Sequence, residues 1–523
     1  MSAIVTDQLR ILNAKKFVQE VTSQSNSYYS FVGLTNPEQY DINWNEEPIQ
    51  PRDSFNDENH IWDTMVGLKK ISPEDVRYAI NKTQWESGNT YDMYRHNITR
   101  DKLSQPTEST SLYSSNYYVI NRDYRVYICL QNGTSPENPE GSPSLDEPLF
   151  TDLEPREAGT SGDGYIWKYL YTIPPNDIVK FDTLDYITVP TDWETNEEYQ
   201  AVRNNALLGG QLKSTVILNR GANLGDPGRI YTGIKVIGDG SGAEATIVIS
   251  SQSTVESVVL SKGGSGYTFA KLDLSTGSFP ISSSGDNPDI EVIIPPQYGH
   301  GYNIYRELGT TKVLVFSQIR NDLANPDFIV GNKISQIGLV SNPLEFDSNE
   351  LLSTNQATSL YALKLTGVNQ SSDYQNAIFE PNTVISQTVS TGSTALGMVI
   401  SYDKNTGVLK YTQDRTLFGY AYSDLRIQDY SNYEKVIQFN STAGTGGSLE
   451  VTGANINLKI DNTFNGNNQS INNRNYYFGQ TFTNGIATPE VQKHSGNIIY
   501  IDNRPAITRS INQREDIKIV LQF

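Results

Sequence analysis

The segment 165–171 places the strongest constraint on the fold of this chain, because it alternates aromatic residues with other residues at a period of two. That period puts successive side chains on opposite faces of a β-strand. The second face is also apolar, apart from Lys168. A strand that is apolar on both faces is buried on both, either as a central core strand or under a partner subunit. The aromatic face consists of Tyr165, Trp167, Tyr169 and Tyr171.

The composition extends this β prediction to the rest of the chain. The 40 Gly and 23 Pro residues indicate many turns and short strands. The 32 Tyr, 17 Phe and 5 Trp residues supply amphipathic faces of the kind that fill cores and anchor interfaces. A chain of 523 residues is too long for one ordinary core, so we expect roughly two to four packed units.

Helical patterns are concentrated near the beginning of the sequence. Residues 7–21 predict an amphipathic helix whose apolar face leaves out Leu9 and Leu12. A second helix is predicted over 61–68. A third is predicted to begin at Ser72, where a Ser cap precedes Pro and two acidic residues. The predicted apolar face of the first helix contains Ile11, Ala14, Phe17, Val18 and Val21.

Strand patterns dominate from about residue 110. Residues 117–120 and 124–130 are separated by a short polar turn and predict a hairpin. The terminal segment 515–523 predicts a half-buried strand that closes a core built from much earlier strands. Its apolar face contains Ile517, Ile519, Leu521 and Phe523, and further strands are predicted over 398–402, 408–411 and 449–460.

The composition changes near 206–295, where Gly, Ser and β-branched residues dominate. A faint repeat relates 216–221 to 258–263, which indicates a small β module rather than a solenoid. The Gly-rich run 238–243 resembles a phosphate-binding loop only superficially. It leads into a predicted strand, whereas a phosphate cradle needs the N-terminus of a helix, so a hairpin is the better interpretation.

The charges and the cysteine count argue against several classes of function. The formal charge of −19 disfavours binding to nucleic acid or to anionic membranes. No run approaches the ~20 apolar residues that span a bilayer, and the start lacks the features of a signal peptide. The single cysteine, Cys129, excludes an intramolecular disulfide and is predicted to be a buried small hydrophobic residue.

We find no catalytic, cofactor-binding or metal-binding motif in the sequence. The four histidines are scattered without the spacing of metal ligands. Asp192 and Glu194 could in principle act as a carboxylate pair, but such pairs are common in a chain this acidic. The candidates that remain are aromatic residues of a core or an interface, and they are Trp62, Trp85, Tyr165, Trp167, Tyr169 and Tyr171.

Three segments resemble one protein family. They are 162–175, with the sequence GDGYIWKYLYTIPP, then 337–344, and the terminal segment 494–523. These segments are similar to the baseplate wedge subunit of T-even-like contractile-tail bacteriophages, gene product eight, in a long version like that of cyanophages. Weaker similarity is found at Ile4–Thr6, at Trp62–Met65 and at Trp85.

The resemblance implies a mainly β protein: a layered β-sandwich core with small helices in its loops. The core would consist of 1–205, 296–348 and 486–523, interrupted by β-rich inserted domains at 206–295 and 349–485. The family also implies a homodimer within each wedge, with contacts to the wedge proteins numbered six, seven and ten. It implies a structural protein of the virion tail baseplate, assembled in the host cytoplasm, with no enzymatic activity and no cofactor.

Two alternatives remain open at this stage. The insertions could act as carbohydrate-binding modules of a tail fibre or baseplate that contacts the host surface. A polysaccharide-degrading tail enzyme is the weaker alternative. Exposed aromatic platforms would favour binding, whereas a cleft with two facing carboxylates would favour the enzyme.

Overall fold

The computed structural model places most of the chain in two compact units. The first consists of 1–18, 77–315 and 519–523, and the second of 19–76 and 316–518. The structure describes residues 3–33, 46–208, 210–281, 286–320, 333–367, 372–375, 377–413, 420–421, 426–427, 437–443, 450–451, 458–510 and 513–523.

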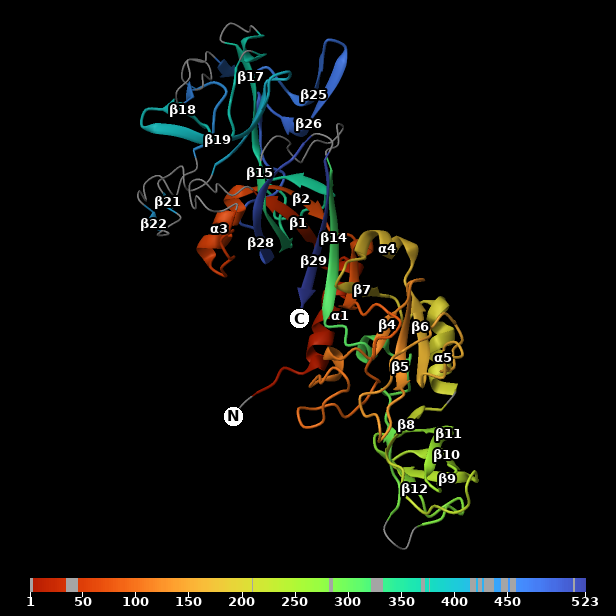
Figure 1. The fold of residues 1–523 in the computed structure, drawn as a ribbon. Coiled ribbons are helices and arrows are strands. Elements are labelled where there is room, and N and C mark those ends of the chain that lie inside the picture. The colour runs from red at the N-terminus through yellow and green to blue at the C-terminus, as the bar shows by residue number, and fades with distance from the viewer. Residues whose placement is uncertain are drawn as a thin grey trace. The chain divides into compact units, whose positions relative to one another are not determined.

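The first unit contains two small antiparallel sheets and several short helices (Figure 1). The three-stranded sheet has the order β4-β5-β6 and consists of Tyr118–Ile120, Arg125–Asn132 and Tyr165–Thr172. The four-stranded sheet has the order β29-β14-β3-β7 and consists of Arg514–Gln522, Lys312–Arg320, Val76–Asn81 and Tyr186–Val189. The first unit contains all of β7 but only residues 519–522 of β29, 312–315 of β14 and 77–81 of β3. The helices of this part are α1 (Asp7–Ser23), α4 (Pro175–Phe181), α5 (Gln200–Leu208) and α6 (Ile304–Glu307).

A six-stranded sheet within the first unit forms a module with its own core, which appears in yellow-green in Figure 1. The outer strands of this sheet, β8 and β11, are joined at both ends. Leu212 N donates to Gly263 O at 3.0 Å, and Val255 N donates to Arg220 O at 2.9 Å. The order is β11-β10-β9-β12-β13-β8, and the strands are Val255–Ser265, Ser241–Ile249, Ile230–Gly238, Ala270–Asp273, Asp289–Ile293 and Ser214–Asn219.

The second unit is built on a five-stranded sheet and a second group of strands. The five-stranded sheet is packed by α3 (Phe55–Thr64), whose Trp62 is buried in the same cluster as Phe31 and Leu68. Its order is β16-β2-β1-β15-β28, with strands Gln356–Thr358, Met65–Lys70, Tyr28–Gly33, Lys333–Ser341 and Asn497–Thr508.

The second group of strands lies largely within the predicted insertion 349–485 and has a separate hydrophobic cluster around Leu363 and Tyr411. Its main strands are β17 (Tyr361–Gly367), β18 (Val384–Ser390), β19 (Ser393–Asp403), β20 (Val408–Thr412), β23 (Glu450–Val451), β24 (Leu458–Ile460) and β27 (Ile486–Ala487). Two small sheets are made by β21 (Tyr420–Ala421) with β22 (Arg426–Ile427) and by β25 (Gly466–Ile471) with β26 (Arg474–Phe482).

The mainly β prediction is confirmed, and so are the first helix and the hairpin of β4 and β5. On α1, the predicted apolar face is buried, whereas Leu9 and Leu12 are 46% and 47% exposed. The repeat at 216–221 and 258–263 falls on β8 and β11, and the run 238–243 leads into strand β10 as predicted. Cys129 is free and buried.

The predicted helix over 61–68 is wrong in its position. Helix α3 begins at Phe55 and ends at Thr64, and the chain then continues directly into β2. Four consecutive residues from Met65 are buried, and two of them, Met65 and Leu68, pack in a hydrophobic core cluster. The backbone of β2 pairs with β1 on one side and with β16 on the other. This pairing between distant segments overrides the local helical pattern.

The helix predicted to begin at Ser72 is also wrong. The start signals produce only a 3-10 turn, Pro73–Asp75, where Ser72 N donates to Asp75 Oδ2 at 3.1 Å. The following residues belong to β3, which pairs with β7.

The terminal strand is present as β29, next to β14. Ile517 and Ile519 are buried, whereas Leu521 and Phe523 are half-buried. The predicted apolar face is therefore confirmed, and its burial decreases toward the end of the strand. In the predicted strand 449–460, the structure has β23 and β24, and residues 452–457 lie outside the described part of the chain.

Candidate functional site

The aromatic face of β6 forms a compact stack in the first unit. Tyr165 and Trp167 are fully buried, with ring centroids 5.3 Å apart and ring planes 14° apart. Tyr91 presents its ring to both at close to right angles and donates its backbone N–H to Tyr165 Oη at 2.9 Å. Burial raises the pKa of Tyr165, so its hydroxyl stays neutral.

The other two residues of this face reach different partners. Tyr171 is buried and donates its hydroxyl to Thr188 O at 2.9 Å, which ties β6 to β7. Tyr169 is half-buried, and its ring lies 5.8 Å from that of Tyr127.

The prediction that β6 is buried on both faces is confirmed, because Lys168 and Leu170 on the opposite face are also buried. Its position as a central strand is wrong, because β6 is at the edge of the sheet β4-β5-β6. A loop covers that edge: Arg156 and Trp167 exchange two backbone hydrogen bonds of 3.0 Å. Coverage by a loop satisfies the same groups that a neighbouring strand would satisfy.

The structure does not bring Trp62 and Trp85 into this stack. Trp62 lies on α3 in the second unit and is buried beneath the five-stranded sheet. Trp85 belongs to the first unit, is half-buried, and donates its indole N–H to Ser144 Oγ at 3.1 Å. The role of all six aromatic residues at an interface remains a prediction.

The sequence reasoning missed Trp193, which is fully buried in the first unit. Its ring stacks on Tyr199 at 4.7 Å, and its indole N–H donates to Tyr302 O at 3.1 Å. Trp193 lies in a polar loop where no period-two or helical pattern marks it, so composition alone offers no signal for its burial.

The buried cation of β6, Lys168, is held by polar partners. Its Nζ donates to Leu153 O at 2.6 Å and to Asn205 Oδ1 at 2.8 Å. Asn205 in turn donates to Glu154, which also pairs with Lys213 at 3.0 Å. Burial lowers the pKa of Lys168 to about 8. This network therefore connects β6, α5 and the beginning of the six-stranded module.

A second buried polar pair follows the six-stranded module in the sequence and includes a residue of α6. Glu307 Oε1 is 2.6 Å from His300 Nδ1, and Glu307 Oε2 accepts from Gly301 N at 2.6 Å. Tyr94 places its ring edge against the imidazole of His300, with centroids 4.8 Å apart. Both carboxylate oxygens are occupied in this way, so Glu307 acts as a structural anchor.

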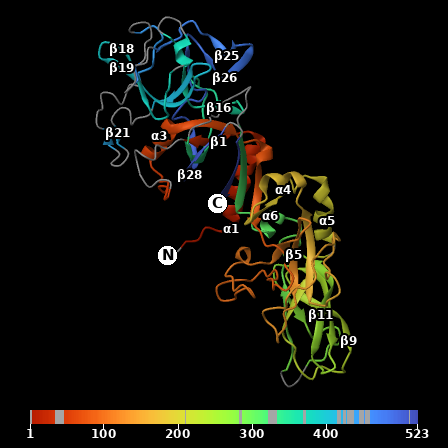
Figure 2. The same cartoon turned by 45° about the horizontal axis from the view of Figure 1, so that its top comes forward.

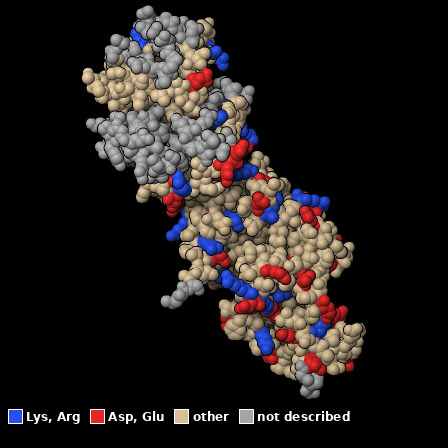
Figure 3. All heavy atoms as spheres, turned by 60° about the vertical axis from the view of Figure 1, so that its left-hand side comes forward, with Lys and Arg blue, Asp and Glu red and all other residues tan. Residues whose placement is uncertain are grey.

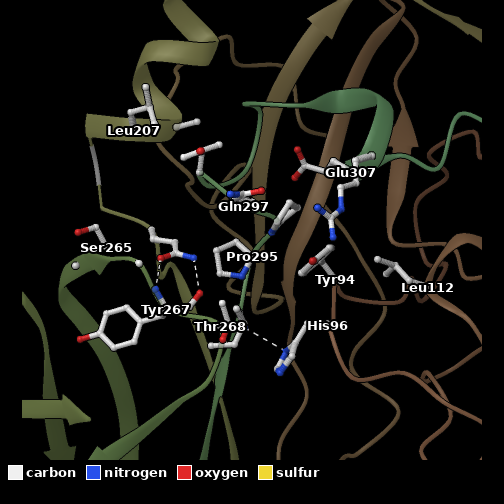
Figure 4. A pocket seen from close by; sticks show the side chains of 18 of the residues that line it. Tyr94, His96, Leu112, Leu207, Ser265, Tyr267, Thr268, Pro295, Gln297 and Glu307 are labelled. Carbon is white, nitrogen blue, oxygen red and sulfur yellow. Dashed lines mark hydrogen bonds between the residues drawn. The ribbon is translucent and has the colours of Figure 1, made fainter. Parts of the chain in front are cut away.

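A cavity of about 780 Å³ lies in the first unit where the six-stranded module joins the rest of that unit. Figure 4 shows Leu207 at the end of α5 and Ser265, Tyr267 and Thr268 from the module around this space. Tyr94, from the segment before β4, also faces it. The volume falls within the range of ordinary ligand pockets, about 300–1,000 Å³.

Metal-ligand clusters and membrane-spanning helices are both absent from the described part of the chain. Within it, no group of three or more His, Cys, Asp and Glu side chains is placed to hold a metal ion. None of its helices combines the length and the apolar character needed to cross a membrane. On the face drawn in Figure 3, acidic and basic side chains are interspersed rather than gathered into one large basic patch.

These features define a β-rich protein whose aromatic residues and several charged side chains are buried in packed cores. Comparison with known proteins finds related sequences. The sequence model of the family described as bacteriophage T4 Gp8 matches residues 154–206, which contain β6, α4, β7 and most of α5.

A relative with a known role also matches. Baseplate wedge protein gp8 of Enterobacteria phage T4 is 27% identical over 218 residues, which are 38% of this chain and 63% of gp8. The chain thus spans less than two thirds of that protein's length. The resemblance seen in the sequence is confirmed: the chain is related to the gp8 baseplate wedge proteins, a family of structural proteins and not of enzymes.

Proposed function

We propose that this protein is a structural component of a phage tail baseplate, in the wedge of a contractile tail. The observation that carries the proposal is the family match over 154–206. That segment supplies the aromatic strand β6, helix α4, strand β7 and most of helix α5.

The same segment carries apolar side chains that a free subunit would expose to water. Val179 on α4 is 82% exposed, and Leu184 in the following turn is 92% exposed. Buried interface cores favour such apolar side chains. We therefore assign α4 and the turn after it to a contact with a neighbouring subunit.

The finer proposals follow from the family resemblance. The protein would form a homodimer within the wedge and would contact the wedge proteins numbered six, seven and ten. It would hold these subunits together and take part in the rearrangement of the baseplate after host attachment. Assembly would take place in the host cytoplasm before the protein becomes part of the virion, and the β-rich insertions 206–295 and 349–485 would be appendages of the core.

The test is assembly of the full chain with co-expressed wedge proteins six, seven and ten, followed by sedimentation. The double variant Val179→Asp with Leu184→Asp should keep the melting temperature of the wild type and lose co-sedimentation, because two charges then enter an apolar contact. Asn176→Asp, also exposed on α4, is the matched control and should assemble normally. Normal assembly of the double variant would contradict the assignment of this surface.

The homodimer has a separate test. Light scattering of the purified chain at micromolar concentration should give twice the mass of 58.3 kDa. A monomer mass across that range would exclude a stable homodimer and leave the wedge role to be decided by the assembly experiment.

A further inference from the structure

We propose that the cavity at the base of the six-stranded module binds a short, neutral saccharide. Its lining combines aromatic rings with amide and hydroxyl groups, including Tyr113, Tyr298, Gln8, Gln297 and Thr268. Aromatic faces pack against the apolar faces of sugar rings, and amides and hydroxyls bond sugar hydroxyls. The proposal is independent of the baseplate role.

One wall of the cavity is held in place before any ligand binds. Gln211 uses both ends of its amide on the backbone of Tyr267: Oε1 accepts from Tyr267 N, and Nε2 donates to Tyr267 O, both at 2.7 Å. Figure 4 draws these two bonds as dashed lines. The Tyr267 hydroxyl donates to Val236 O at 3.2 Å and accepts from Ala243 N at 3.3 Å. A preformed wall reduces the entropy cost of binding.

Another part of the lining carries a strained, exposed aromatic residue. Tyr298 is 52% exposed and has a φ of 70°, in the left-handed region that disfavours bulky side chains. Its ring lies 4.8 Å from that of Tyr302. Such backbone strain is found preferentially at ligand sites and active sites. A large apolar ring in this position suits a platform for a sugar ring.

The charges at the cavity favour a neutral ligand. Among the lining residues, Glu307 is the one carboxylate, and His300 and Gly301 already occupy its oxygens. A hydrolytic site would need a second, facing carboxylate, so the lining fits binding rather than cleavage. Arg306 supplies a cation, but the net charge of −19 disfavours polyanionic ligands.

The experiment is saturation-transfer NMR on the full chain with a panel of neutral probes: maltotriose, cellobiose, N,N′-diacetylchitobiose, mannobiose and lactose. At least one should receive saturation, and the signal should fall at least fivefold in Tyr298→Gly. Tyr477→Ala, which removes a tyrosine of similar exposure in the second unit, should leave the signal unchanged. Gln297→Leu, an exposed amide of the lining, should weaken the signal without affecting folding.

Tyr298→Gly also separates loss of binding from loss of folding. Glycine accepts a positive φ without strain, so this variant should melt at or above the temperature of the wild type. Lost binding with unchanged or raised stability supports the site. The proposal is overturned if none of the neutral saccharides gives a signal, if Tyr298→Gly binds as well as the wild type, or if only acidic probes such as sialyllactose bind.

Discussion

The aromatic rings of Phe17 on α1 and Phe523 after β29 pack against each other in the first unit, with centroids 5.9 Å apart and planes at 44°. The backbone N–H of Phe523 also donates to Thr311 O at 3.0 Å. Figure 2 shows the C-terminus beside α1. Segments from opposite ends of the sequence therefore complete the same core.

Replacing Phe523 tests whether its ring contact with Phe17 stabilises the fold. Phe523→Ala should lower the free energy of unfolding by about 1–3 kcal/mol, less than for a fully buried ring because Phe523 is half-buried. Gln522→Ala, at the exposed last residue of β29, should change it by less than about 0.5 kcal/mol. Urea unfolding measures both, and equal effects of the two substitutions would show that the ring contact contributes nothing.

Deletion of 517–523 should be far more damaging. It removes two buried isoleucines, Ile517 and Ile519, whose burial contributes about 3–6 kcal/mol together. It also removes most of an edge strand and exposes its neighbour β14. We expect insoluble protein or a chain without a cooperative melt, judged by circular dichroism. A cooperative melt within a few degrees of the full chain would show that this segment is dispensable.

Removal of the first insertion should leave a folded protein. The module has its own hydrophobic cluster, and its ion pairs to the rest of the unit, such as Lys102 with Glu291 and Lys213 with Glu154, are partly exposed and weak. Replacing 206–295 with a short Gly-Ser linker should therefore preserve a cooperative thermal transition. Deletion of 349–485 would also remove β16 from the five-stranded sheet, so the second deletion is 361–485, which retains β16 and has the same expected outcome. Loss of soluble protein in both deletions would refute independent folding of the insertions.

The buried Lys168 predicts a pH dependence of stability. Its pKa is about 8 in the folded protein, whereas an unfolded lysine titrates near pH 10.4. Between these values the unfolded chain binds more protons, so this residue makes the folded state more stable as the pH rises. The gain should be about 2 kcal/mol between pH 8 and pH 10. Below pH 8 the full cost of burying the charge remains.

A difference measurement isolates this residue. The pKa of Cys129 is raised by burial, so its thiol acts in the opposite direction above pH 8.5 in any variant that retains it. Urea unfolding of the wild type and of Lys168→Met should therefore be compared at each pH, with Lys16→Met as the exposed control. Parallel curves for the wild type and Lys168→Met would refute the prediction.

The sequence by itself determined which faces of several elements are apolar. On α1 the spacing of apolar residues separated the buried face from Leu9 and Leu12. On β6 the alternation correctly indicated burial on both faces, including that of Lys168. These predictions succeeded because periodicity is a local property that follows from the geometry of a helix or a strand.

Only the tertiary structure decided what covers each face. It placed Met65–Lys70 between two strands from distant parts of the chain, moved β6 to a sheet edge covered by a loop, and buried Trp193 from a polar loop. It also brought Gln211 and Tyr298 to the walls of one cavity. The physical reason is that strand pairing and cavity shape depend on hydrogen bonds and burial between residues far apart in sequence, which no local pattern of side chains records.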